Sequence, residues 1–191
     1  SQVLTLCLAL SFDAAPNSET EAGYARLMTP VIKYWTCKIC PPLIFEAMEC
    51  LGGNGFVEDS ILPRLYREAP LNAIWEGSGN VMCLDVLRAI RRGPKSVDAV
   101  LQTIAYDLGG NASQTIDVLR VAADIALEDE GSARLLTEQM ALTAAAAEMR
   151  RSLPTVLADA FAESRLGRPW RYTYGMMDAR YDARAIIDYV C

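Results

Sequence analysis

The sequence predicts an all-α protein, a helical bundle, on three observations. Apolar residues recur at intervals of three and four, as in Tyr24, Leu27 and Val31, which is the spacing of one face of an α-helix. Clusters of glycine, proline and asparagine separate the apolar segments, and these residues end helices. Nothing resembles the strict apolar–polar alternation of half-buried strands.

The first helix is predicted over residues 3–12 and the second over residues 21–51, where the apolar periodicity is longest. Between them, residues 13–18 form a turn in which Ser18 is placed to cap the second helix. The first stretch is too short to cross a membrane, and no run of 18 or more apolar residues exists elsewhere. We therefore expect no transmembrane helix.

Three prolines interrupt the second predicted helix, Pro30 and the pair Pro41–Pro42. Each lacks an N–H group and clashes with the preceding turn, at a cost of about 3 kcal/mol inside a helix. We therefore expect a kink or break near Cys40. The alternative is a loop at that point, which leaves the apolar periodicity unexplained.

The rest of the chain continues as helices between turn signals. Residues 52–55, Gly-Gly-Asn-Gly, end the second helix, because such residues readily take left-handed backbone angles. The alanine-rich stretch 141–147 has high helix propensity and little bulk, so neighbouring helices can approach it closely. The predicted elements are a short helical turn over 63–68 and helices over 78–91, 96–108, 113–126, 129–152, 154–165 and 178–189.

Composition excludes several classes of protein. With 191 residues and 52% hydrophobic side chains, the chain can build one substantial core or a main bundle with a small appendage. The formal net charge of −6 disfavours non-specific nucleic-acid binding through the whole surface, so any DNA contact needs a local basic patch. There is no histidine, which excludes a Ser-His or Cys-His couple and an imidazole zinc site.

The six cysteines are scattered, and Cys37 and Cys40 form the only close pair. No second such pair exists to complete a four-thiolate site, so we expect no metal. On a helix these two residues share a face, and we interpret them as small core residues. The cysteine usage fits a reducing, cytoplasmic setting best.

The turn over residues 74–80, Ile-Trp-Glu-Gly-Ser-Gly-Asn, holds the candidate catalytic group, Glu76. Glu76 is placed where a helix begins, so the helix dipole would lower its pKa, whereas burial against Trp75 would raise it. From spacing alone, the simpler interpretation is a first-turn acid that satisfies free N–H groups. A general base is the alternative.

The glycine turn over residues 52–55, the turn over residues 74–80 and their surroundings resemble the C-terminal helical domain of the acyl-CoA dehydrogenase family. The segments over residues 46–56, 62–68 and 75–88 carry the resemblance, which is dense over 27–92 and thin afterwards. In detail they are similar to the AidB-like branch, a flavoprotein group linked to the response to DNA alkylation. The resemblance implies a longer natural protein, whose N-terminal helical domain and β-domain lie outside this chain.

The resemblance also implies how the chain is divided and what it binds. Residues 1–92 would form the helical-bundle core and residues 93–191 an additional helical region with an AidB-like extension, either as one continuous domain or as two packed halves. The expected cofactor is FAD, the expected substrate an acyl-CoA thioester, and the expected assembly a homotetramer. Without the other domains, we expect neither strong FAD binding nor activity.

In the family, the acid equivalent to Glu76 removes the α-proton of the acyl thioester while a hydride leaves the β-carbon for the flavin. Such a base needs a dry pocket and a pKa near the working pH. The same turn binds the cofactor, and its backbone N–H groups suit a pyrophosphate at a helix N-terminus. The residues implied are Ile74, Trp75, Gly77, Ser78, Gly79 and Asn80.

The glycine turn, Leu51, Gly52 and Gly53, resembles the segment that reaches the flavin nucleotide of a neighbouring subunit; a plain helix C-cap is the alternative. The chain departs from many relatives at three positions. Ser78 and Asn80 are shorter than the usual Thr and Gln, and Glu49 replaces a Gln. A carboxylate at position 49 would repel a pyrophosphate.

The resemblance brings a second function, DNA binding or protection with vestigial dehydrogenation. Its candidate residues are Arg88, at the position matching an arginine of the AidB-like branch, with Arg91 and Arg92 close behind. Another basic cluster, with interleaved aromatics, consists of Arg165, Arg168, Trp170, Arg171, Tyr172 and Tyr174. A solvated face with salt bridges is the simpler interpretation of both clusters. A third possibility is a purely structural role in tetramer formation.

Overall fold

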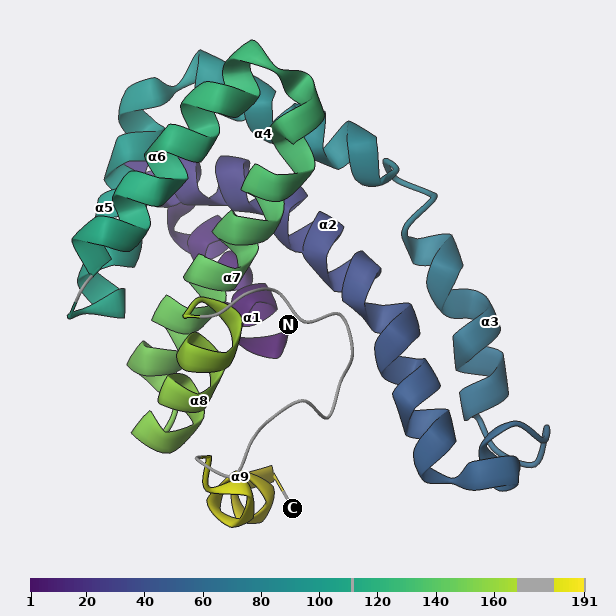
Figure 1. Cartoon of the computed structure of the whole chain (residues 1–191). Coiled ribbons are helices and arrows are strands. Elements are labelled where there is room, and N and C mark those ends of the chain that lie inside the picture. The colour runs from purple at the N-terminus through teal and green to yellow at the C-terminus, as the bar shows by residue number, and fades with distance from the viewer. Residues whose placement is uncertain (111, 168–180, 191) are drawn as a thin grey trace.

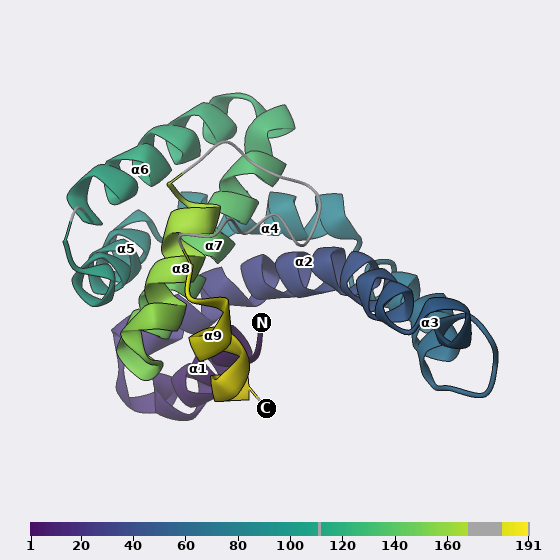
Figure 2. The same cartoon turned by 60° about the horizontal axis from the view of Figure 1, so that its bottom comes forward.

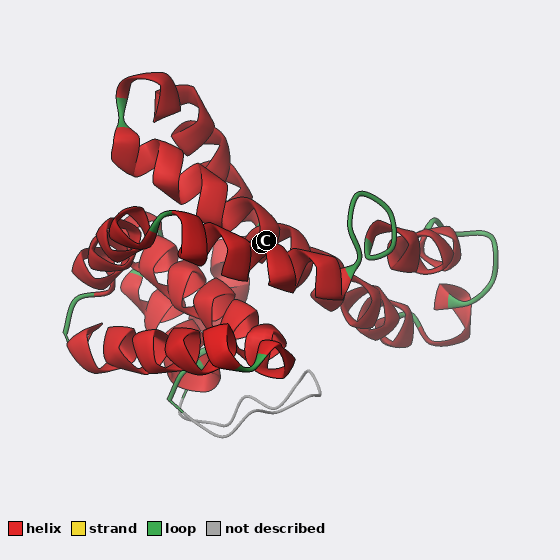
Figure 3. Cartoon of the chain, turned by 90° about the horizontal axis from the view of Figure 1, so that it is seen from above, coloured by secondary structure: helices red, strands yellow, loops and turns green. Residues whose placement is uncertain are grey.

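The protein is described by a computed structural model, which covers residues 1–110, 112–167 and 181–190. These residues form helices and loops only (Figure 3), which confirms the all-α prediction. The α-helices are α1 (Gln2–Ala14), α2 (Glu19–Cys50), α3 (Leu62–Asn72), α4 (Gly79–Arg92), α5 (Pro94–Leu108), α6 (Ala112–Glu128), α7 (Ala133–Ser152), α8 (Thr155–Arg165) and α9 (Ala183–Val190). Short 3-10 turns are η1 (Ala15–Asn17), η2 (Gly52–Gly55) and η3 (Glu130–Ser132).

Helix α2 begins as predicted but does not break. The hydroxyl of Ser18 accepts a hydrogen bond from the N–H of Glu21 at 3.3 Å, which confirms the predicted cap. The helix then runs unbroken through Pro30, Pro41 and Pro42 to Cys50, so a break near Cys40 and the alternative loop are both wrong. A kink at that point, the other form of the prediction, stays a prediction. Packing of the second half of α2 against α3 offsets the cost of the missing N–H groups.

The second half of α2 and the antiparallel α3 form an arm that extends away from the other helices (Figures 1 and 2). Its tip is η2 and the loop that follows, where Gly52 has a φ of +58°. This left-handed angle explains why glycine ends α2, as predicted. Helix α3 is longer than the predicted helical turn and contains Pro70.

The remaining helices pack around α7, which contacts α1, α2, α4, α5, α6 and α8. Six alanines of α7 are buried, Ala133, Ala141 and Ala144–147, and their small side chains let neighbouring helices come close. One apolar cluster spans from Leu4 to Ala147 and so crosses the predicted division at residue 92. That division into two regions stays a prediction.

The two paired cysteines are not core residues. Cys37 and Cys40 are free thiols that are only partly buried, because α2 turns Tyr34 and Trp35 toward the core instead. The prediction that they belong to the core is therefore wrong. Among the described residues, no three His, Cys, Asp or Glu side chains are grouped so that they could hold a metal ion.

The buried acid of this bundle is Glu148, on α7, with 7% of its surface exposed. One carboxylate oxygen accepts hydrogen bonds from the Arg151 guanidinium, the shorter at 2.6 Å, and the other accepts one from the Cys7 thiol at 3.1 Å. These bonds join α1 to α7. No helix among the described residues combines the length and apolar character that crossing a membrane would require.

Candidate functional site

The turn that holds Glu76 connects α3 to α4. After α3 the chain stays coiled, because the N–H groups of Ile74 and Trp75 both donate to the carbonyl of Leu71, at 2.9 and 3.2 Å. Gly77 follows with a φ of +104°, and Ser78 is the N-cap of α4. Glu76 therefore lies two residues before the cap, rather than inside the helix.

This position corrects the simpler interpretation of Glu76. The first turn of α4 contains no acidic residue, so Glu76 is not a first-turn acid that caps free N–H groups. Trp75 does not bury it either, since the indole is itself 55% exposed and Glu76 is exposed. The carboxylate lies on an open face of the chain.

The backbone of Glu76 is strained. Its φ of +54° makes it the sole non-glycine residue with a positive φ in the described part of the chain. A left-handed conformation costs a non-glycine residue about 1–2 kcal/mol. Such costs persist where the surrounding structure enforces them, and they concentrate at functional sites.

Lys33, on α2, bonds to the backbone carbonyls of the two residues that flank Glu76. Its ammonium donates one hydrogen bond to the carbonyl of Trp75 at 2.9 Å and another, shorter one to the carbonyl of Gly77. A half-buried ammonium needs acceptors, and the turn supplies two. Lys33 was not among the residues predicted from the sequence; the signal available there was a lysine between two pairs of apolar or aromatic residues, Val31–Ile32 and Tyr34–Trp35.

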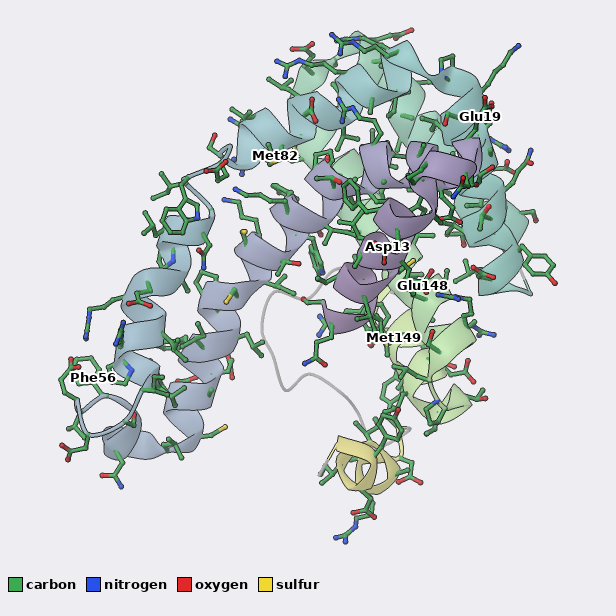
Figure 4. All side chains as sticks on the ribbon, turned by 180° about the vertical axis from the view of Figure 1, so that it is seen from behind. Asp13, Glu19, Phe56, Met82, Glu148 and Met149 are labelled. Carbon is green, nitrogen blue, oxygen red and sulfur yellow. The ribbon has the colours of Figure 1, made fainter. Side chains whose placement is uncertain are left out.

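A largely apolar groove of about 570 Å³ runs beside the carboxylate. Helices α1, α2 and α4 form its walls, and Met82, which Figure 4 labels near the start of α4, is one of its lining residues. The groove is lined by Phe12, Ala15, Ala22, Ala25, Arg26, Thr29, Pro30, Lys33, Glu76, Met82 and Asp85.

The first turn of α4 offers backbone donors at the exposed residues Asn80 and Val81, whereas Gly79 is buried. Ser78 makes no side-chain cap hydrogen bond, so the first N–H groups of the helix, beginning at Gly79, lack a side-chain acceptor. The side chain of Asn80 is less available for a cofactor than predicted, because its oxygen accepts a hydrogen bond from Arg134 of α7 at 2.7 Å. Arg134 is the second residue of this site that the sequence analysis missed.

The structure does not bring the two predicted cofactor-binding turns together within the chain. Leu51, Gly52 and Gly53 are exposed at the tip of the arm, near Phe56 in Figure 4. The turn holding Glu76 is at the opposite end of α3. An 11-residue helix separates them, which is about 16 Å at 1.5 Å per residue.

The arginines proposed for DNA binding have acidic neighbours. Arg91 pairs with Glu130 at 3.2 Å, and Arg88 lies 3.8 Å from Asp85. Arg92 lines a separate pocket between α2, α4 and α5. Of the second basic cluster, Arg165 ends α8, whereas Arg168, Trp170, Arg171, Tyr172 and Tyr174 lie outside the described residues.

Residues 4–91 match the family described as "Acyl-CoA dehydrogenase, C-terminal domain". The chain therefore carries the helical C-terminal domain of the acyl-CoA dehydrogenase family. Within that family it is AidB-like: it is 38% identical over 156 residues to the putative acyl-CoA dehydrogenase AidB of Escherichia coli (strain K12). That alignment covers 82% of this chain and 29% of AidB.

A second relative is acyl-CoA dehydrogenase family member 11 of Caenorhabditis elegans, 47% identical over 76 residues, which cover 40% of this chain and 12% of that protein. The chain thus spans 29% or less of these two relatives.

Solved structures show the same fold. Bd2924 in its apo form matches with a TM-score of 0.70 and 29% identity, covering 79% of this chain and 30% of that one. Caenorhabditis elegans ACDH-11 in complex with C11-CoA matches with a TM-score of 0.66 and 25% identity, covering 98% of this chain and 36% of that one.

Proposed function

We propose that this domain supplies the catalytic base and part of the cofactor site of an FAD-dependent acyl-CoA dehydrogenase-like oxidoreductase. The base is Glu76. The observation that carries the proposal is an exposed carboxylate on a strained turn that Lys33 holds at the mouth of an apolar groove. Strain, fixation and exposure together suit a group that must meet a partner at a defined position.

The reaction removes two hydrogens from a saturated acyl thioester. Glu76 takes the α-hydrogen as a proton, and its carboxylate becomes a carboxylic acid. The electron pair of that C–H bond forms the new double bond as the β-hydrogen leaves as a hydride. FAD, when bound, accepts that hydride.

The residues present fit part of an FAD. The uncapped N–H groups of Asn80 and Val81, exposed residues in the first turn of α4, are donors for a pyrophosphate or a ribose oxygen. At Gly52 and Gly53, an added Cβ would meet no atom within 4 Å, so the backbone there is open to close approach by a nucleotide. Because the side chain of Asn80 is bonded to Arg134, we assign the contact at position 80 to its backbone.

The other parts of the site are assigned to further domains. The substrate class rests on the family and on the neighbouring structure, ACDH-11, which was solved with C11-CoA. An N-terminal helical domain and a β-domain would cover the groove, exclude water and complete the flavin pocket. A cytoplasmic homotetramer, in which the glycine turn reaches the flavin of a neighbouring subunit, belongs to the same proposal.

Duplex binding gains no support from the geometry. A DNA-binding face presents cations that are free to contact phosphates, whereas Arg88 and Arg91 have carboxylate neighbours. We therefore do not propose it as the function of this domain.

The test is anaerobic reduction of the flavin by an acyl-CoA in the whole protein, followed through the loss of its visible absorbance. Glu76→Gln keeps the size of the side chain and removes the base, so the reduction rate should fall by about 10²- to 10⁴-fold. Glu128→Gln is the matched control, an exposed glutamate at the end of α6 and away from the groove. Reduction at the wild-type rate in Glu76→Gln would show that the base is another group.

A further inference from the structure

We propose that Lys33 is the positioning residue of this site, a lysine that holds the base in place through backbone carbonyls and not through its carboxylate. The inference rests on the proposed function in one respect, that Glu76 is the base. The hold of Lys33 on the turn can be tested without that assumption.

The geometry of this interaction is specific. One ammonium bridges the carbonyls of Trp75 and Gly77, the residues on either side of Glu76. It thereby ties together two peptide groups between which the chain takes its left-handed step, with a φ of +54° at Glu76 and +104° at Gly77. A side chain that bonded only one of these carbonyls would leave the other side of the step free to rotate.

The turn has few other restraints. Upstream, the N–H of Trp75 bonds to Leu71, and downstream the N–H of Met82 bonds to Ser78. Between these points, in the described chain, the hydrogen bonds to the backbone carbonyls of the turn come from Lys33, whereas Arg134 of α7 bonds to the side chain of Asn80. Ser78 adds no side-chain cap. The conformation of Glu76 therefore depends on α2 more than on α4, the helix that follows the turn.

Helix α2 is a rigid base for this interaction. The residues on both sides of Lys33 are buried: Val31, Ile32, Tyr34 and Trp35. Asp85, one of the two acids that line the groove, forms a two-pronged ion pair with Arg26, at 2.8 and 2.9 Å. Glu76 is the other acid that lines this groove.

The consequence for catalysis is positional. A base displaced by about 1 Å from its reaction geometry loses up to about 10²-fold in rate. Without the ammonium, the backbone of Glu76 can relax from its left-handed conformation toward ordinary angles. That change would move the carboxylate. The effect should appear in kcat more than in KM, because Lys33 is bonded to the turn and not to the substrate.

The first test is hydrogen–deuterium exchange of the whole protein without substrate, measured on peptides that cover residues 73–82. Lys33→Met removes the donors and keeps the length of the side chain. A hydrogen bond to a charged group is worth enough for its loss to accelerate local exchange about 10-fold or more. In Lys33→Arg, which keeps a cationic donor, the same peptides should exchange within about threefold of the wild-type rate. Lys95→Met is the control: Lys95 is exposed on α5, so this variant should exchange at the wild-type rate over residues 73–82.

The second test is single-turnover flavin reduction by the same variants. Lys33→Met should lower the limiting rate of reduction about 10- to 100-fold, with the half-saturating acyl-CoA concentration changed far less, and Lys33→Arg should restore most of that rate. Unchanged exchange over residues 73–82 in Lys33→Met would overturn the proposal, and so would an arginine variant as slow as the methionine one.

Two safeguards keep these outcomes separable. If Lys33→Met folds poorly, Lys33→Gln takes its place, because its shorter side chain cannot span both carbonyls. The exchange result does not depend on Glu76 being the base. Fast exchange in Lys33→Met together with full activity in Glu76→Gln would therefore sustain the hold of Lys33 on the turn while removing the proposed function.

Discussion

Replacing Glu76 by glycine should make the protein more stable while abolishing its proposed chemistry. Glu76 has a φ of +54°, a conformation that glycine adopts without penalty. Its side chain is exposed and has no recorded hydrogen bond, so truncation to alanine alone should change the free energy of unfolding by less than about 0.5 kcal/mol. Alanine keeps the backbone strain, and glycine removes it.

The size of the effect follows from two opposing terms. Relief of the left-handed conformation contributes about 1–2 kcal/mol, and the greater freedom of glycine in the unfolded chain removes about 0.5–1 kcal/mol. Glu76→Gly should therefore exceed Glu76→Ala in stability by about 0–1.5 kcal/mol, with a midpoint of about 0.75 kcal/mol. For a chain of this size, 1 kcal/mol corresponds to a rise in Tm of about 2–4 °C.

The assay is urea unfolding followed by circular dichroism, with Glu46 as the matched position. Glu46 lies inside α2, where changing alanine to glycine should cost about 1 kcal/mol. The sign of the alanine-to-glycine difference should thus reverse between positions 46 and 76. If glycine destabilises both positions equally, the left-handed angle of Glu76 does not exist in solution, and the argument from strain fails.

Three further predictions concern the bundle. Burial, reinforced by Glu148, raises the pKa of Cys7 to about 11, so at pH 8 its thiolate fraction is about one in a thousand; mass spectrometry should find it alkylated far more slowly than exposed Cys50, and equal rates would contradict this. Burial raises the pKa of Glu138, so its contribution to stability is present below the unfolded pKa and is lost as pH rises through the folded one. Glu138→Gln should accordingly raise Tm at pH 7, with the gain shrinking below about pH 4, and a gain that persists in acid would contradict it. Ala146→Leu overfills the fully buried face of α7 and should lower the free energy of unfolding by about 1–3 kcal/mol, whereas no change in a urea titration would mean that the helices there are not closely packed.

Much of the fold was predictable because local signals agree with it. Ser18 caps α2 as expected, the glycines after Cys50 end it, and α4 begins one residue after the predicted start. The failures have a tertiary cause. Pro41 and Pro42 argue for a break on local grounds, and only packing against α3 explains why α2 continues.

The sequence marks the candidate turn but not its geometry. The order of Trp75, Glu76 and Gly77 marks the turn, yet no local rule states that a glutamate adopts a left-handed angle there. The partner that holds it, Lys33, is 42 residues from Trp75 along the chain. Interactions across such separations depend on how helices pack, which periodicity alone does not specify.

The most direct test of the account is exchange of the α-hydrogen of an acyl-CoA with D₂O, catalysed by the whole protein and read by mass spectrometry. Proton removal alone determines this signal, so it isolates the role of Glu76 from hydride transfer. The account predicts rapid exchange in the wild type and a loss of about 10²- to 10⁴-fold in Glu76→Gln. Exchange that proceeds equally fast in the two proteins would contradict it.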